Sequence, residues 1–149
     1  MSDQFPAEVG WGLRALLGGF LDRVADLTKA AEAEAALQPR IIKERFERRL
    51  VELVGEAAPL ERIVQEAAVM AVKADVREEL DRLAGHLVSG RALLTDKAAA
   101  GRRLDFLTQE FMRETNTLCS KSATPALTAI GLDLKAVIDQ FREQAQNVE

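Results

Sequence analysis

The stretch Asp105–Lys121, DFLTQEFMRETNTLCSK, decides the fold of this 149-residue chain. On a helical wheel that starts one residue earlier, the apolar residues gather on one side: Leu104, Leu107, Phe111 and Leu118, with Met112 and Cys119 at the margin. This spacing predicts an amphipathic helix whose apolar side faces a core. The other side is dense in Gln, Glu, Arg, Asn and Thr, although Asn and Thr are mediocre helix formers. We therefore expect the polar side to contact a partner and not only water.

The rest of the chain repeats the helical period and predicts an all-α protein of about six helices. The expected helices span roughly residues 7–37, 39–55, 59–73, 75–94, 101–121 and 125–148. Together they predict a long antiparallel bundle of helical hairpins, in which the last helix has a coiled-coil-like apolar seam. We expect residues 1–58 to form an N-terminal helical region with its first few residues disordered, and residues 59–149 to form a second helical domain.

Short local patterns predict where the helices begin and end. Pro39 is favourable in a first turn, so it is expected to separate the first two helices. Asp75 followed by Glu78 has the spacing of a capping box, which predicts that a helix restarts there after a kink. Thr124 before Pro125 predicts the cap and first turn of the last helix.

Composition narrows the function and the location. The net charge of −4 argues against a surface that attracts nucleic acid everywhere, although a local basic patch would suffice for binding. The single cysteine, Cys119, cannot form an internal disulfide, so we expect a reducing cytoplasm. Neither a signal peptide nor an apolar run of membrane-spanning length is visible, so we expect no membrane association.

The second expected helix carries a concentration of basic side chains. They are Arg40, Lys43, Arg45, Arg48 and Arg49. One interpretation is a strip that binds phosphates. The other is an ordinary solvated surface, because Glu44 and Arg48, and Arg48 and Glu52, have the i,i+4 spacing of surface ion pairs. We favour the solvated surface.

Three residues could carry chemistry. Glu110 and Glu114 lie one helical turn apart and project the same way, so they could bind a divalent metal. His86, the only histidine, could act as an acid or base if its helix packs alongside. The alternative is a buried polar network in which Arg113 neutralises the carboxylates and His86 caps a carbonyl. Phe106 lies amid the polar residues, which suggests a second packed surface or a stacked base.

Three segments together resemble the C-terminal domain of the YicC family of bacterial stress-associated proteins, the YicC-like endoribonucleases. They are KADVREELDRLAGHL (73–87), GRRLDFLTQEFMRETNTLCSK (101–121) and LKAVIDQFREQAQNVE (134–149). The resemblance covers roughly residues 60–149 in the family's order. Departures from the family pattern occur at Gly85, Met112, Ala123, Thr124 and Ala126. Members usually carry an upstream α/β domain, which we expect to be absent from this chain.

The resemblance implies a cytoplasmic endoribonuclease that cleaves single-stranded RNA, takes part in stress-linked RNA turnover and forms a homo-oligomer, a hexamer in full-length members. Chemistry alone assigns the site residues. The candidates are His86, Glu110, Glu114 and Arg113 for catalysis, and Arg82, Arg102, Arg103, Phe106, Gln109, Asn116 and Lys121 for binding RNA. His86 or Glu110 is the candidate base, Arg82 and Arg113 are candidate phosphate clamps, and Phe106 is a candidate for stacking a base.

Glu110 and Glu114 are also the candidate ligands for Mg²⁺ or Mn²⁺, and no small-molecule cofactor is expected. Two other classes of function stay open. The chain could be a helical oligomerisation and RNA-gripping module without chemistry of its own. It could also be a helical adaptor with no role on RNA, which the acidic net charge favours.

Overall fold

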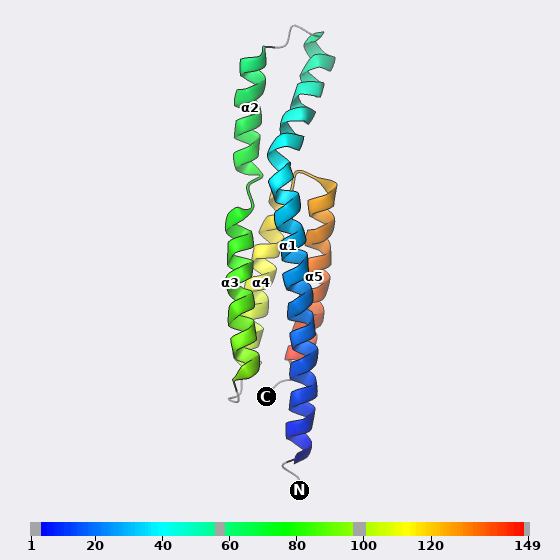
Figure 1. The fold of residues 1–149 in the computed structure, drawn as a ribbon, viewed down its shortest axis with the longest axis vertical. Coiled ribbons are helices and arrows are strands. Elements are labelled where there is room, and N and C mark those ends of the chain that lie inside the picture. Colours follow the sequence, from blue (N-terminus) through cyan, green and yellow to red (C-terminus); the bar gives the residue numbers. More distant parts are fainter. Residues whose placement is uncertain (1–3, 56–58, 97–100, 148–149) are drawn as a thin grey trace.

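The computed structural model describes residues 4–55, 59–96 and 101–147, with side chains from residue 12 onward. These residues form five helices and no strand, which confirms the all-α prediction (Figure 1). The helices are α1 (Gln4–Val54), α2 (Leu60–Lys73), α3 (Arg77–Thr95), α4 (Gly101–Lys121) and α5 (Pro125–Ala145). The predicted disorder of the first few residues falls outside the described part of the chain.

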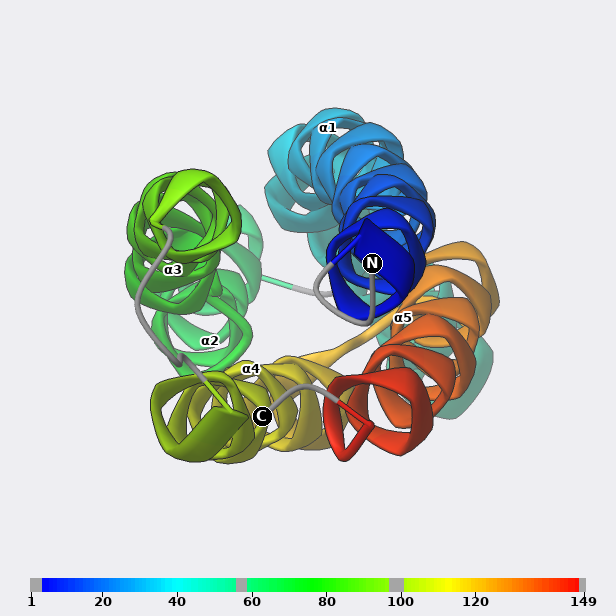
Figure 2. The ribbon, with the colours of Figure 1, turned by 90° about the horizontal axis from the view of Figure 1, so that it is seen from below.

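Four helices form an antiparallel bundle. Seen end-on, α1, α3, α4 and α5 surround one core, and each packs against its two neighbours in the ring (Figure 2). The second half of α1 extends beyond this bundle and pairs with α2, which lies above α3 in Figure 1. Short connections between consecutive helices favour this up-and-down arrangement. The molecule therefore has a bundle and a projecting two-helix hairpin.

The prediction of six helices was wrong, because the first two are one continuous helix that contains Pro39. Gln38 explains why the chain does not turn there. Its buried side chain donates from Nε2 to the Ala74 carbonyl at 2.8 Å and accepts at Oε1 from the Ala123 amide at 2.7 Å. These two bonds attach α1 to the α2–α3 and α4–α5 connections beside the proline. Long-range hydrogen bonds thus oppose the helix-breaking tendency of proline.

The bundle core matches the predicted apolar stripes. In α4, the predicted inward residues Leu104, Leu107, Phe111 and Leu118 are all buried. In α5, the buried residues include Leu127, Leu134, Val137 and Phe141, whereas the predicted end of this helix at residue 148 lies outside the described residues. The hairpin is less well buried than the bundle. Leu53 and Met70 are 74% and 42% exposed, because α1 is the one helix against which α2 packs extensively in the described part of the chain.

The predicted helix restart near Asp75 occurs, but not through a capping box. The N-terminal cap of α3 is Val76, which makes no side-chain cap. Asp75 instead accepts at Oδ1 from the Arg77 amide at 3.0 Å and pairs with the Arg77 guanidinium. Hydrogen bonding from the Arg77 guanidinium, followed by that from the Arg77 amide, holds the pKa of Asp75 below its ordinary value. At α5, Thr124 accepts from the Leu127 amide at 3.2 Å, as predicted.

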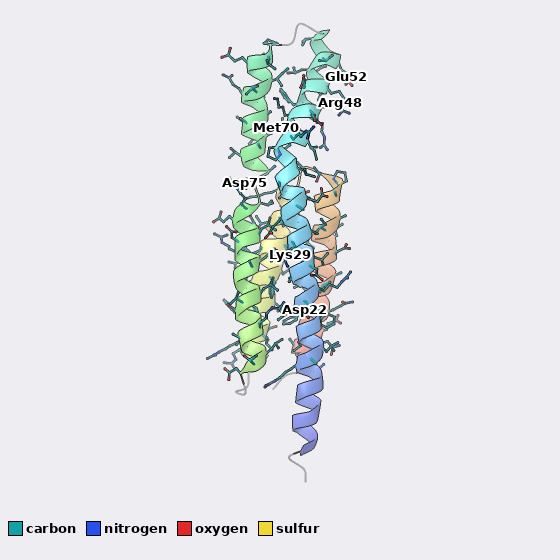
Figure 3. The ribbon with its side chains drawn as sticks, viewed as in Figure 1. Asp22, Lys29, Arg48, Glu52, Met70 and Asp75 are labelled. Atoms are coloured by element: carbon teal, nitrogen blue, oxygen red, sulfur yellow. The ribbon has the colours of Figure 1, made fainter. Side chains whose placement is uncertain are left out.

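The basic side chains of α1 lie mainly on the hairpin. Figure 3 places Arg48 and Glu52 on the part of α1 that extends beyond the bundle. Glu44 pairs with Arg40 at 3.2 Å, not with Arg48, and both side chains are more than half exposed. Arg45 donates to the Ala123 carbonyl at 2.7 Å. The pairs therefore differ from those expected, although the surface is solvated as favoured.

Candidate functional site

The bundle brings together His86 of α3 with Glu110 and Glu114 of α4. One ligand atom from each residue, an imidazole nitrogen or a carboxylate oxygen, lies within 4.8 Å of the others. We call these residues the trio. The carboxylates share one side of α4 because they are one turn apart, and the antiparallel packing of α3 places His86 opposite them. The sequence indicated both halves of the trio, and the packing joins them.

The trio is largely shielded from solvent but poorly satisfied by hydrogen bonds. The Glu114 side chain is 5% exposed and that of Glu110 is 22% exposed. Within the described part of the chain, no hydrogen bond reaches either carboxylate, and the buried Nε2 of His86 has no partner. Buried polar atoms without partners are costly and uncommon. A ligand that accepts lone pairs from all three residues would relieve this cost.

Phe111 supports the histidine from the core side. The two rings meet edge to face, with centroids 5.8 Å apart and planes at 83°. Phe111 in turn contacts Phe141 of α5 in the same geometry at 6.4 Å. The position of His86 is thus coupled to the apolar core, and its Nε2 does not cap a carbonyl as the alternative interpretation required.

Two arginines lie at the rim of the trio. Nη1 of Arg82 is 3.6 Å from Oε1 of Glu114, and Nη1 of Arg113 is 3.9 Å from Oε1 of Glu110. Both guanidinium groups are more than half exposed, and Arg82 also pairs with Glu78. Neutralisation of the carboxylates is therefore partial, because exposed ion pairs are weak. The arginines remain able to reach an anion in solvent.

A second polar contact between α3 and α4 involves Glu79. Its side chain is 3% exposed, and Lys121 Nζ lies 2.5 Å from its Oε1. Hydrogen bonding to Glu79 raises the pKa of Lys121 above its ordinary value. Lys121, a predicted RNA-binding residue, is thus engaged with Glu79 in the single chain, while Oε2 of Glu79 has no partner in the described residues.

The other predicted RNA-binding residues lie on the outer surface of α4. Arg102, Arg103, Gln109 and Asn116 are exposed, and Phe106 is 63% exposed. Asp105, also exposed, accepts a hydrogen bond from Gln109 and does not join the trio. The outer surface of α4 is therefore available to a partner along its length.

A groove of about 470 Å³ runs between α4 and α5. Its lining includes Gln109, Met112, Arg113, Asn116, Ile138 and Arg142. Arg113 both lines this groove and approaches Glu110 of the trio. The sequence indicated the α4 residues but not the contribution of Arg142, because the facing residue of α5 depends on how the two helices are rotated and aligned.

Comparison with known proteins identifies the family. Residues 31–149 match the family described as endoribonuclease YicC-like, C-terminal. The chain belongs to this family. It is 47% identical over 89 residues to the probable endoribonuclease YicC of Haemophilus influenzae, covering 60% of this chain and 31% of that protein. It is 34% identical over 109 residues to the probable endoribonuclease YicC of Clostridioides difficile, covering 72% of this chain and 37% of that protein.

The YicC-like match contains the whole trio and the groove. It begins inside α1 and therefore includes the projecting hairpin as well as α3, α4 and α5. The chain spans about a third of the length of the two relatives. Among the described residues, no helix is both long and apolar enough to cross a membrane.

Proposed function

We propose that this chain is the part of a YicC-like endoribonuclease that cleaves single-stranded RNA, and that cleavage takes place at His86, Glu110 and Glu114. The observation that carries the proposal is the meeting of an imidazole and two carboxylates within 4.8 Å, on the shielded side of α4. Family membership, and the naming of both relatives as probable endoribonucleases, support the same chemistry. We place this activity in bacterial stress-linked RNA turnover by the family resemblance.

The donor set of the trio fits a divalent cation. Two carboxylates and one imidazole suit Mn²⁺ well, and Mg²⁺ accepts the carboxylate oxygens. A cation held by Glu110, Glu114 and His86 would supply Lewis-acid stabilisation of the charge that develops on the scissile phosphate. The buried Nε2 of His86, which has no partner among the described residues, supports this fit.

The protein's own residues would orient the strand. Arg82 and Arg113 lie at the rim, where their planar guanidinium groups can hold phosphate oxygens by paired hydrogen bonds. Phe111 fixes the ring of His86 and keeps water from its core side. The exposed Phe106 offers a surface on which a base can stack.

A metal-free route uses the same histidine differently. His86 would accept the proton of the ribose 2′-hydroxyl, and the 2′-oxygen would attack phosphorus. The bond to the 5′-oxygen then breaks, and that oxygen takes a proton from solvent. This route leaves a 2′,3′-cyclic phosphate, whereas attack by water preserves an uncyclised phosphate end. The chemistry of the product ends therefore separates the two routes.

The second candidate is an oligomerisation and RNA-gripping module that lacks chemistry of its own. Two observations favour it: Phe106 is exposed, and the chain spans about a third of its relatives' length. In this case the chemistry would belong to another part of a longer protein, and the outer surface of α4 would contact RNA or a sister subunit in a homo-oligomer.

Incubating the purified chain with labelled single-stranded RNA separates these possibilities. We expect cleavage with Mn²⁺ or Mg²⁺, loss of cleavage in EDTA, and loss in the folded variants His86→Ala and Glu110→Ala. Glu47→Gln on the exposed part of α1 is the control. Binding without cleavage would contradict the nuclease proposal and favour the RNA-gripping module. The absence of both binding and cleavage would favour an adaptor.

A further inference from the structure

The α4–α5 groove has the size and chemistry of a ligand site, and Arg113 links it to the trio on the other side of α4. At about 470 Å³ it falls within the range typical of small-molecule sites. Its floor is apolar, with Ile138 fully buried and Met112 half-buried, while its rim is polar. An apolar floor with a few polar groups around it suits a flat ring that carries hydrogen-bonding edges.

Two arginines provide positive charge along the groove. Arg142 of α5 is exposed and makes no ion pair within the described part of the chain. Arg113 of α4 has only a long contact with Glu110, at 3.9 Å. Both guanidinium groups are therefore free to take phosphate oxygens, which they bind in paired geometry. A phosphate-bearing strand is the ligand that these charges favour.

Two amides supply groups that can distinguish bases. Asn116 has no side-chain hydrogen bond in the described residues, and Gln109 has only a 3.3 Å bond to the exposed Asp105. Each amide offers both a donor and an acceptor. Sequence-specific recognition of RNA acts on the edges of unstacked bases in single strands, where such side chains are effective.

We propose that the α4–α5 groove binds a nucleotide of the single-stranded RNA that flanks the cleavage position. Arg142 and Arg113 hold its phosphates, Met112 and Ile138 support the base, and Asn116 reads the base edge. Arg113 also approaches Glu110 of the trio at 3.9 Å, so it connects the groove with the proposed cleavage site. This inference rests on the proposed action on RNA, and it assigns Arg142 as a binding residue and Asn116 as a specificity residue.

The test measures binding of short fluorescent homopolymeric RNAs to the full chain in EDTA, where no metal-dependent cleavage interferes. Arg142→Gln should weaken binding of every sequence by about tenfold, because it removes a charge-assisted contact. The slope of log affinity against log salt should fall by about 0.7, the value for one phosphate contact on a single strand. Arg142→Lys should keep the slope, and Asn116→Ala should reduce the difference between homopolymers.

The matched control is Arg23→Gln, which changes an exposed arginine of α1 that does not line the groove. Equal affinities of Arg142→Gln and this control for RNA would overturn the proposal that the groove binds RNA. A wild-type chain that binds no RNA would also overturn it. Cleavage measured in parallel keeps the two proposals apart. If the chain cleaves RNA and Arg142→Gln does not weaken binding, only the proposal for the groove is rejected. If Arg142→Gln weakens binding but the wild-type chain does not cleave, only the proposal for the nuclease is rejected.

Discussion

The buried contacts of α4 differ between its two long sides. Toward α5, α4 packs tightly through apolar residues: Phe111 meets Phe141, and Cys119 lies against Gly131, where there is no room for a larger residue. Toward α3, α4 presents Glu110 and Glu114 to His86, and Lys121 to Glu79. One helix therefore contributes both to the core of the bundle and to its polar site.

This difference separates buried contacts that account for stability from buried contacts that do not. Apolar burial is the dominant favourable contribution to folding. A buried ionic contact adds little or nothing compared with well-packed apolar residues, because both charges lose their hydration. The unpartnered atoms of Glu79 and His86 increase that cost. Stability alone does not explain the α3 side of α4, which is the side where we propose that cleavage takes place.

The largest expected effect is on the α5 side. Leu134→Ala removes a fully buried side chain and should lower the free energy of unfolding by about 2–5 kcal/mol. Leu132→Ala, on the same helix at 56% exposure, should stay within about 0.5 kcal/mol of wild type. Urea denaturation measures both. Equal losses in the two variants would show that the α4–α5 contact is not the tight core described.

Glycine at position 131 allows a sharper test of the same contact. A Cβ there would lie 2.4 Å from Sγ of Cys119, so Gly131→Ala should destabilise by about 1–3 kcal/mol. At Gly85 of α3 nothing lies within 4 Å, so Gly85→Ala should stabilise by up to about 1 kcal/mol through helix propensity. Thermal unfolding gives the sign of each change, and the same sign in both would contradict the account.

On the α3 side, Lys121→Met should destabilise the protein, because it leaves Glu79 unpaired. The loss should be smaller than in Leu134→Ala, because the lysine is partly exposed. Replacing both residues by methionine should recover the loss. The pKa of Lys121 is raised in the folded state above its ordinary value of 10.5. The Lys121–Glu79 pair therefore contributes its full stability below pH 10.5, and this contribution is lost as the pH rises through the raised pKa. Urea denaturation across this pH range should show that the free energy of unfolding of the wild type approaches that of Lys121→Met as the pH rises. A difference between them that grows with pH would exclude this pair as its source.

The sequence predicted what depends on local spacing. The stripe of Leu104, Leu107, Phe111 and Leu118, and the shared side of Glu110 and Glu114, follow from 3.6 residues per turn, and both appear in the structure. The prediction of a helix break at Pro39 was wrong, because Gln38 makes hydrogen bonds to residues far away in sequence. Local preference cannot include such partners.

What depends on the rotation and alignment of neighbouring helices was beyond sequence reasoning. The partner of His86 on α4, the burial of Glu79 beside Lys121, and the presence of Arg142 in the groove are all of this kind. The exposure of Leu53 and Met70 has the same origin, because a periodic pattern does not say how many neighbours a helix has.

The most direct test of a functional α3 side is to measure both RNA cleavage and stability in Glu114→Gln. With saturating Mn²⁺, we expect the cleavage rate to fall by about a hundredfold or more, because a ligand of the site is lost. The free energy of unfolding should stay level or rise, since a buried charge is removed. Wild-type cleavage by a variant that unfolds more easily would show that Glu114 supports the fold and not the reaction.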